Sequence, residues 1–240
     1  AASVDEITLQ HPISIEDDVT LEGAVVWTGS SSMDIQVTLT QPRFSSPSLK
    51  GIFSFVNLDP ATRKAAPVKP VEVPAPGSAA RATYDERQAL ADDRKHARQA
   101  AAAAGPNASS VTKEARSFMA PLLAEYRRAV ELPALSAASG GAIPMPSTAL
   151  QNTFVCQPQQ RNMHGRIFGG FLMRRAYELA FATTYTFGGG RPAFVKCDEI
   201  TFKKPVDVGD LLRFRSRVTH TVPEKGLLCV EVEATVAKPE

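Results

Sequence analysis

Asn162-Met-His-Gly-Arg-Ile-Phe-Gly-Gly170 runs without a break into Phe171-Leu-Met-Arg-Arg-Ala-Tyr-Glu-Leu-Ala-Phe-Ala-Thr-Thr-Tyr185. A glycine pair that opens a helix leaves backbone N–H groups uncovered at the positive end of the helix dipole. Such a position suits an oxygen atom that carries negative charge. The stretch therefore predicts a loop, a helix that begins near Gly169, and a site for an oxyanion at the start of that helix.

The helix after the glycine pair is mostly apolar. Up to Phe187 its only charged residues are Arg174, Arg175 and Glu178, and a helix with so little polar surface is wrapped by other structure. Alternating apolar residues predict strands in three stretches downstream, which are residues 194–202, 211–218 and 227–236. A buried helix followed by an antiparallel meander predicts an α+β hot-dog fold.

Composition excludes several classes of protein. The 240 residues are 43% hydrophobic, which is enough for one large core or two small ones. The net charge is only +2 and aromatic residues do not interleave with basic clusters, so nucleic acid is not an expected partner. No run approaches the ~18 uncharged apolar residues of a membrane span. The three cysteines lack C-x-x-C spacing, which indicates a reducing compartment and no zinc site.

An internal repeat organises the chain. Val4 to Ile15 reads against Cys197 to Val208 without a gap, and both copies contain Asp-Glu-Ile-Thr followed by an equivalent proline. Weaker similarity continues downstream, where residues 19–27 correspond to 211–218 and residues 33–39 correspond to 228–236. Strand 49–56 has no counterpart after Glu240, and the glycine loop and helix that precede the second copy have none before Asp5.

The repeat predicts three parts. Residues 1–58 form a partial first hot-dog domain of strands only, and residues 151–240 form a second domain whose last strand is missing. We expect the two sheets to join into one continuous antiparallel sheet. Residues 59–150 are a connector, with an extended proline-rich segment over 67–77.

Two helices are expected in the connector, where their predicted role is packing and spacing. The first begins at the capping-box spacing of Thr83 and Glu86 and ends at Gly105-Pro106. The second covers about 112–131 and is bent or restarted at Pro121.

Three segments resemble one known family. Residues 159–180, Phe187-Gly-Gly and residues 198–210 look like the long mitochondrial acyl-coenzyme A thioesterases with two hot-dog domains, of the type called acyl-coenzyme A thioesterase nine. The match is dense over 151–236 and collinear but weaker over 1–56. The loop pattern N-x-x-G-x-x-[HF]-G-G of this fold is satisfied by Asn162, Gly165, Phe168, Gly169 and Gly170.

The resemblance implies a double hot-dog architecture in which antiparallel sheets each wrap a central helix, with the helix of the first copy missing from this chain. It implies hydrolysis of fatty acyl-coenzyme A to free fatty acid and coenzyme A, without a metal or cofactor. It also implies a mitochondrial location and a homo-oligomer or a subunit of a larger complex. The alternative hypothesis is a non-catalytic hot-dog subunit with a structural or acyl-coenzyme A-binding role, because the first copy lacks its helix.

Thioester hydrolysis needs a donor for the developing oxyanion, an activated water and a slot for the acyl chain. The N–H of Gly170, together with that of Gly169, is the expected donor. Glu178 is the only carboxylate of the helix and is the candidate general base, with a pKa raised by burial. Asn162 is expected to hold the water or the thioester carbonyl. Arg166 and Phe168 are expected, with Gly169, to bind substrate.

Each assignment has a structural alternative. Glu178 follows Arg174 by four residues and Arg175 by three, which also suits an ion pair on the helix surface. Asn162 can stabilise its own loop through an Asx-turn, and the glycine pair can serve close approach of helix and sheet. Arg166 either contacts the coenzyme A phosphates or only the loop. A serine nucleophile is not expected because G-x-S-x-G is absent, and Cys197 and Cys229 are expected in the core.

Overall fold

The computed structural model describes residues 3–62, 64–104, 113–131 and 143–237. The chain divides into two compact units, each of which is described by itself. Unit 1 comprises Ala1–Ala108 and Phe194–Lys203, and unit 2 comprises Ser109–Ala193 and Lys204–Glu240. A short segment that follows the glycine-opened helix in sequence therefore belongs to unit 1.

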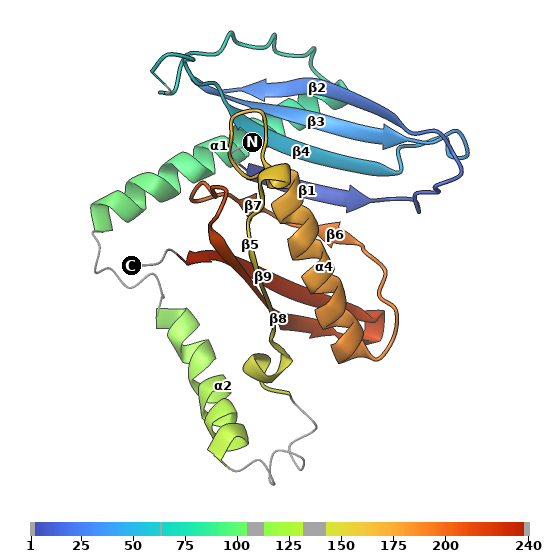
Figure 1. The fold of residues 1–240 in the computed structure, drawn as a ribbon. Coiled ribbons are helices and arrows are strands. Elements are labelled where there is room, and N and C mark those ends of the chain that lie inside the picture. The colour runs from blue at the N-terminus through green and yellow to red at the C-terminus, as the bar shows by residue number, and fades with distance from the viewer. Residues whose placement is uncertain (1–2, 63, 105–112, 132–142, 238–240) are drawn as a thin grey trace. The chain divides into compact units, whose positions relative to one another are not determined.

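Unit 1 contains a six-stranded antiparallel sheet (Figure 1). The hydrogen-bonded order is β2-β3-β4-β1-β6, and β7 also pairs with β1. The prediction that residues 1–58 contain only strands is confirmed over the described residues 3–58, since β1 is Ser3–Leu9, β2 is Thr20–Thr28, β3 is Ser32–Thr40 and β4 is Leu49–Val56. The strand predicted over 194–202 is instead two short strands, β6 (Lys196–Cys197) and β7 (Ile200–Thr201).

The two copies of the repeat pair with each other in a symmetric register. Val4 corresponds in the repeat to Cys197, and Ile7 corresponds to Ile200. In the sheet Val4 lies opposite Ile200 and Ile7 lies opposite Cys197. Each residue therefore faces the counterpart of the other, which is the pattern of a local pseudo-twofold axis.

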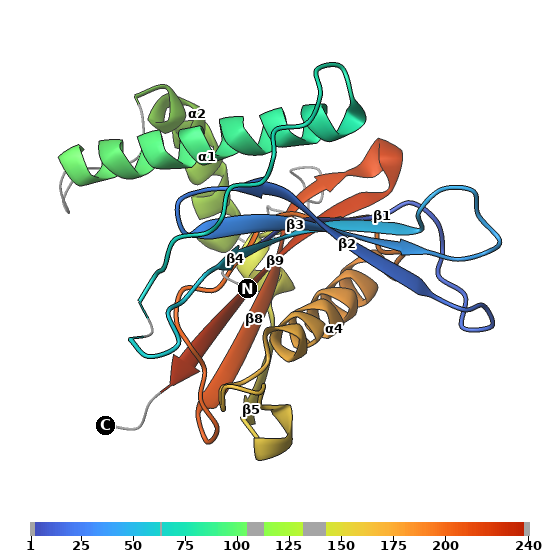
Figure 2. The same ribbon diagram turned by 90° about the horizontal axis from the view of Figure 1, so that it is seen from above.

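Helix α1 (Ala79–Ala104) packs on one face of this sheet (Figure 2). It begins one turn earlier than predicted, because Ser78 Oγ accepts the backbone N–H of Arg81 at 3.1 Å and caps the helix. Thr83 lies inside the helix, where its hydroxyl donates to the carbonyl of Ala79 at 3.3 Å. The predicted stop at Gly105-Pro106 lies outside the described residues.

Charged side chains fasten α1 to the sheet. Arg87, whose side chain is 5% exposed, pairs with Asp5 of β1 and with Asp34 of β3, the latter at 2.8 Å. Arg94 pairs with Asp5 at 2.9 Å and with Glu199 at 3.2 Å. The predicted packing role is therefore confirmed for α1.

Unit 2 contains an antiparallel sheet in the order β5-β8-β9. Its strands are β5 (Leu150–Val155), β8 (Leu211–Val222) and β9 (Leu227–Ala237), and helix α4 (Gly169–Gly188) packs against all three. This helix and meander confirm the hot-dog outline. The described strands form two sheets, so the expected single continuous sheet is wrong, although strands of the second copy do extend the sheet of the first.

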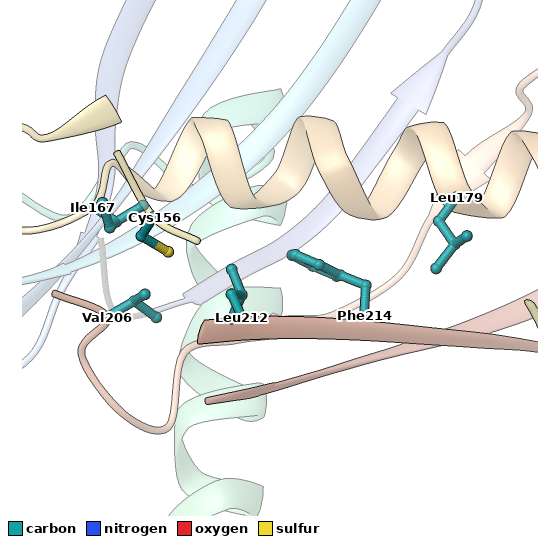
Figure 3. Close-up of a cluster of buried hydrophobic side chains, with 6 residues drawn as sticks. All are labelled: Cys156, Ile167, Leu179, Val206, Leu212 and Phe214. Atoms are coloured by element: carbon teal, nitrogen blue, oxygen red, sulfur yellow. The ribbon is translucent and has the colours of Figure 1, made fainter. Parts of the chain in front are cut away.

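The core of unit 2 lies between α4 and β8 (Figure 3). Strand β8 alternates buried and exposed positions because one face lies under the helix. Cys156 is buried in this core, whereas Cys229 on β9 is exposed, so the expectation that Cys229 lies in the core is wrong. The core cluster consists of Cys156, Ile167, Leu179, Val206, Leu212 and Phe214.

Helix α2 (Lys113–Glu131) is one continuous helix that contains Pro121. Of the two predicted effects of this proline, a bend or a restart, the restart is therefore wrong, and the bend stays a prediction. The missing proline N–H removes one backbone hydrogen bond without ending the helix. Among the helices that the structure describes, none is long and apolar enough to cross a membrane.

Candidate active site

The loop before α4 folds on itself around Asn162. The Asn162 N–H donates to the carbonyl of Arg166 at 2.6 Å, and Gly165 turns the chain with φ +82°. The side-chain oxygen Oδ1 of Asn162 accepts the N–H groups of His164 at 2.8 Å and Arg166 at 3.2 Å. The Asx-turn alternative is therefore present, and only Nδ2 of Asn162 is left without a hydrogen bond to any residue within the described ranges.

Two backbone donors are free where α4 begins. Phe168 occupies the N-cap position with φ −69° and ψ 128° and makes no side-chain cap. Its carbonyl accepts the N–H groups of Phe171 at 3.0 Å and Leu172 at 3.3 Å. The N–H groups of Gly169 and Gly170 donate to no group in the part of the chain that the structure describes. They are the uncapped positive end of the helix.

The ring of Phe168 lies against Gly170. A Cβ atom at Gly170 would come within 2.4 Å of Cε1 of that ring, which no side chain can tolerate without moving the ring. Phe168 is 57% exposed, so burial does not hold its ring in place. The missing side chain of Gly170 therefore lets an exposed aromatic ring occupy the space that a Cβ at this position would need.

Strand-like contacts position the loop within unit 2. The N–H of Ile167 donates to the carbonyl of Val206 at 2.9 Å, and the Ile167 side chain is buried in the core. Arg166 forms a bridge with Asp207, and its Nε lies 3.8 Å from Asp207 Oδ1. Arg166 thus has a partner in its own unit, which is the structural alternative to phosphate binding.

Glu178 is bound by both neighbouring arginines. Its two carboxylate oxygens accept Arg174 Nε and Arg175 Nη1, each at 2.9 Å. The hydrogen bond from Arg174 lowers the pKa of Glu178, and the smaller effects of burial and Arg175 leave it below its ordinary value. The expectation of a pKa raised by burial is wrong, because the side chain is 41% exposed. Glu178 also lies eight residues beyond Gly170, which is ~12 Å along a helix.

Arg175 was not expected to do more than pair with Glu178. Its guanidinium lies over the rings of Phe154 and Phe171, at 5.3 Å from each centroid. Its Nε is buried and makes no hydrogen bond to any residue that the structure describes. The four-residue spacing of Phe171 and Arg175 was a signal for one of these contacts. Phe154 comes from β5, and no local pattern connects it to the helix.

The structure thus brings five of the six predicted site residues into one loop and helix start. These are Asn162, Arg166, Phe168, Gly169 and Gly170. Glu178 stands apart from them, two turns along α4. Burial raises the pKa of the Cys156 thiol, which makes a thiolate nucleophile unfavourable there. The described residues hold no group of three or more His, Cys, Asp or Glu side chains that could bind a metal ion.

The chain is similar in sequence to known thioesterases. A family model described as the thioesterase superfamily matches residues 164–238. The chain is 40% identical to acyl-coenzyme A thioesterase 2, chloroplastic, of Humulus lupulus over all of this chain and 55% of that protein. It is 43% identical to acyl-coenzyme A thioesterase 4, mitochondrial, of the same organism over all of this chain and 45% of that protein. It is 34% identical to human acyl-coenzyme A thioesterase 9, mitochondrial, over 98% of this chain and 53% of that protein.

A solved structure supports the fold. It belongs to a Lactobacillus plantarum protein assigned as an oleoyl thioesterase, which matches all of this chain and 76% of its own with a TM-score of 0.53 at 10% identity. The resemblance drawn from the loop and the repeat is confirmed by these matches. The chain spans about half the length of the curated relatives it matches, at 55%, 45% and 53%.

Proposed function

We propose that this protein hydrolyses acyl-coenzyme A to a free fatty acid and coenzyme A, because residues 164–238 match the thioesterase superfamily model. Three relatives that are similar along almost the whole chain are named acyl-coenzyme A thioesterases. The proposal concerns the loop and helix start of unit 2, where the predicted site residues gather.

One observation carries the proposal: the free N–H groups of Gly169 and Gly170 at the uncapped start of α4. When water attacks a thioester, the carbonyl oxygen becomes an oxyanion. Fixed backbone donors at a helix start stabilise that charge without having to reorganise. In this proposal the free Nδ2 of Asn162, in the loop that leads into α4, holds the attacking water or the substrate carbonyl.

The identity of the general base is a separate question from the identity of the oxyanion donors. An ionised Glu178 has the charge that a base requires, but it is paired with two arginines and lies ~12 Å from Gly170 by helix rise. A base must come within hydrogen-bond reach of the water it activates. The arrangement in unit 2 therefore favours the ion pair for Glu178, and substitution at this residue decides between the two roles.

We place the protein in mitochondria by its likeness to relatives named mitochondrial, although one relative of comparable identity is named chloroplastic. Assembly as a homo-oligomer or within a larger complex is part of the same proposal. A non-catalytic subunit that binds acyl-coenzyme A is the second candidate, and it is favoured by the separation of Glu178 from the helix start.

The test is hydrolysis of acyl-coenzyme A followed by release of the free thiol, on the full chain and across short and long acyl groups. We expect saturable release of coenzyme A. Binding of acyl-coenzyme A in calorimetry without any thiol release would support the non-catalytic subunit. The absence of both binding and release would overturn both functions.

A further inference from the structure

Helix α2, which belongs to unit 2, carries large apolar residues that are exposed. Their exposed fractions run from 42% for Tyr126 to 72% for Phe118. The six residues are Phe118, Met119, Leu122, Leu123, Tyr126 and Val130. Most of the stability of a helix in a protein comes from packing of its apolar face, because isolated helices of this length are marginal in water. The exposed residues of α2 therefore indicate a partner that covers them.

These residues form one apolar stripe along the helix. At ~100° per residue they occupy an arc of about 140°, with Tyr126 near its middle. None of the charged residues of α2 falls within this arc, and Pro121 also lies outside it. Met119, Leu122 and Tyr126 follow one another at steps of three and four residues, which is the spacing by which two helices pack along a common seam. The stripe therefore has the form of a helix-pairing surface.

The two borders of the stripe carry opposite charges. By the same rotation per residue, Arg116 and Arg127 follow one border, and Glu114 and Glu125 follow the other. Each arginine is two residues away from a glutamate, which corresponds to ~3 Å along the helix axis. The basic and acidic positions thus lie at nearly equal heights on the two sides of the stripe.

This charge pattern selects one arrangement of two identical helices. In a parallel pair related by a twofold axis along the helices, each border of one helix lies beside the other border of its partner. Arginine then meets glutamate on both sides of the pair. In an antiparallel pair the twofold axis is perpendicular to the helices, and each border meets its own copy, so that like charges face each other. Charge complementarity therefore favours the parallel pair.

A lipid surface is the other kind of partner that an exposed amphipathic helix can bind. Helices that lie on membranes are rich in lysine and arginine on their polar face. Helix α2 contains four basic and three acidic residues, and one border of its stripe is acidic. Anionic headgroups would attract one border and repel the other, whereas a second copy of α2 complements both.

We propose that the apolar stripe of α2 is a self-association surface, at which the helix pairs in parallel with α2 of a second copy of this chain. The inference goes beyond the proposed hydrolysis, because α2 contains none of the residues assigned to the candidate active site. It gives the proposed homo-oligomer a defined surface.

Leu122→Glu tests the surface by placing a charge within the stripe. Because Leu122 is 51% exposed, the variant should fold as wild type does, which circular dichroism checks. We expect light scattering after size exclusion to give the mass of two chains for wild type and of one chain for Leu122→Glu. Ala124→Glu, at an exposed position outside the stripe, is the matched control and should stay dimeric. A monomeric wild type, or a dimer that Leu122→Glu leaves intact, would overturn the proposal.

Charge reversal tests the parallel arrangement. In a parallel pair, Glu125→Arg places like charges side by side at two symmetric positions, so the dissociation constant of the dimer should rise about tenfold. The double variant Glu125→Arg with Arg127→Glu should bring it back to within about twofold of wild type, because the borders are again opposite in charge. A dimer that Leu122→Glu dissociates but Glu125→Arg does not weaken would overturn the parallel pairing.

Two further readings separate this inference from its alternatives. Cosedimentation of a monomeric wild-type chain with vesicles of phosphatidylcholine and phosphatidylserine, and its loss in Leu122→Glu, would identify a lipid surface as the partner and overturn self-association. Thiol release measured on the same samples reads the proposed hydrolysis separately. A dimer without thiol release leaves the pairing of α2 standing, and thiol release by a monomer leaves the proposed hydrolysis standing.

Discussion

Gly170 combines two properties that another residue cannot supply together. Its N–H is free at the start of α4, and its lack of a side chain leaves room for the Phe168 ring at a distance where a Cβ would clash. In Gly170→Ala the N–H remains, but the ring must move. A change in catalytic rate in this variant would therefore result from displacement of the Phe168 ring or of the start of α4, and not from loss of the N–H donor.

We expect Gly170→Ala to lower kcat by ~10²-fold, the order of loss that follows when a reacting group is misplaced by about 1 Å. Gly188→Ala is the matched control, because a Cβ there would meet Leu228 Cδ1 at an ordinary 3.6 Å. Both variants are compared by thiol release and by urea unfolding. An unchanged kcat in Gly170→Ala would remove the ring and the helix start from the mechanism.

For Glu178→Gln we expect kcat within about twofold of wild type and a loss of ~0.3–0.5 kcal/mol in the free energy of unfolding, the usual contribution of a helix-surface ion pair. Glutamine keeps the shape and hydrogen-bonding capacity of the side chain, so folding is retained. Parallel kinetics and urea unfolding check both numbers. A drop in kcat of ~10²–10⁴ would instead establish Glu178 as the general base.

The sequence predicted which residues form the loop before α4 better than it predicted the pKa of Glu178. Asn162, Phe168 and the glycine pair are adjacent in sequence, so their proximity follows from the chain itself. The pKa of Glu178 depends on how far the side chain is exposed and where the arginine side chains point. The spacing of Glu178 to Arg174 and Arg175 is compatible with both a buried general base and an exposed ion pair. Only the exposure of the side chain in the folded protein distinguishes these two roles.

At the scale of elements, local periodicity predicted α4, β8, β9 and the first four strands. The predicted bounds were wrong for the strand over 194–202 and for the start of α1. In the first case a tertiary contact sets the observed bounds, and in the second case a different N-cap residue does. Strand 194–202 is interrupted at Asp198 and Glu199, and its two halves pair with β1 of unit 1. Such non-local pairing leaves no mark in the alternation of apolar residues. Helix α1 begins after Ser78, which caps it, because the residues between Ser78 and Thr83 include none that would interrupt a helix.

Arg87 is the residue on which the packing of α1 depends most. Substitution by methionine fills similar space but leaves the buried carboxylates of Asp5 and Asp34 without their shared partner. We expect Arg87→Met to lower the free energy of unfolding of unit 1 by ~3–5 kcal/mol, the cost of breaking a buried pair from one side. Urea unfolding followed by the fluorescence of Trp27 measures this loss.

The matched control is Arg81→Met on the same helix. Arg81 pairs with Asp85 at 2.8 Å on the exposed surface, so its removal should cost less than ~1 kcal/mol. Equal losses in the two variants would mean that the buried network does not hold α1 to the sheet.

At the scale of the whole molecule, the repeat places one tetrapeptide in two opposite environments. The side chain of Asp5 is 5% exposed and bound by two arginines, whereas that of its counterpart Asp198 is 86% exposed and pairs with Lys196. The difference arises because α1, which supplies the arginines, covers the Asp5 side of the shared sheet. The sequence repeat alone predicts equivalent environments for Asp5 and Asp198. The environments differ because the two copies are surrounded by different elements.

This asymmetry predicts that acid destabilises unit 1 through Asp5. Burial by itself raises the pKa of Asp5, but the hydrogen bonds from Arg94 and Arg87 outweigh it and hold the pKa below its ordinary value. A carboxylate with a lowered folded-state pKa stabilises the fold fully above its unfolded pKa of ~3.9 and loses that contribution as the pH falls through the folded value. The stability of unit 1 should therefore fall steeply below about pH 4.

Trp27 is the single tryptophan of the chain, lies in unit 1, and donates from Nε1 to Gln88 of α1 at 3.0 Å. Its fluorescence during urea unfolding at a series of pH values therefore follows the attachment of α1. We expect the unfolding free energy of wild type to decline more steeply between pH 5 and pH 2.5 than that of Asp5→Asn, which has no carboxylate to protonate. Asp198→Asn is the control and should decline as wild type does, because its carboxylate is exposed. If wild type and Asp5→Asn lose stability with the same slope, the paired carboxylate of Asp5 is not the origin of the acid sensitivity.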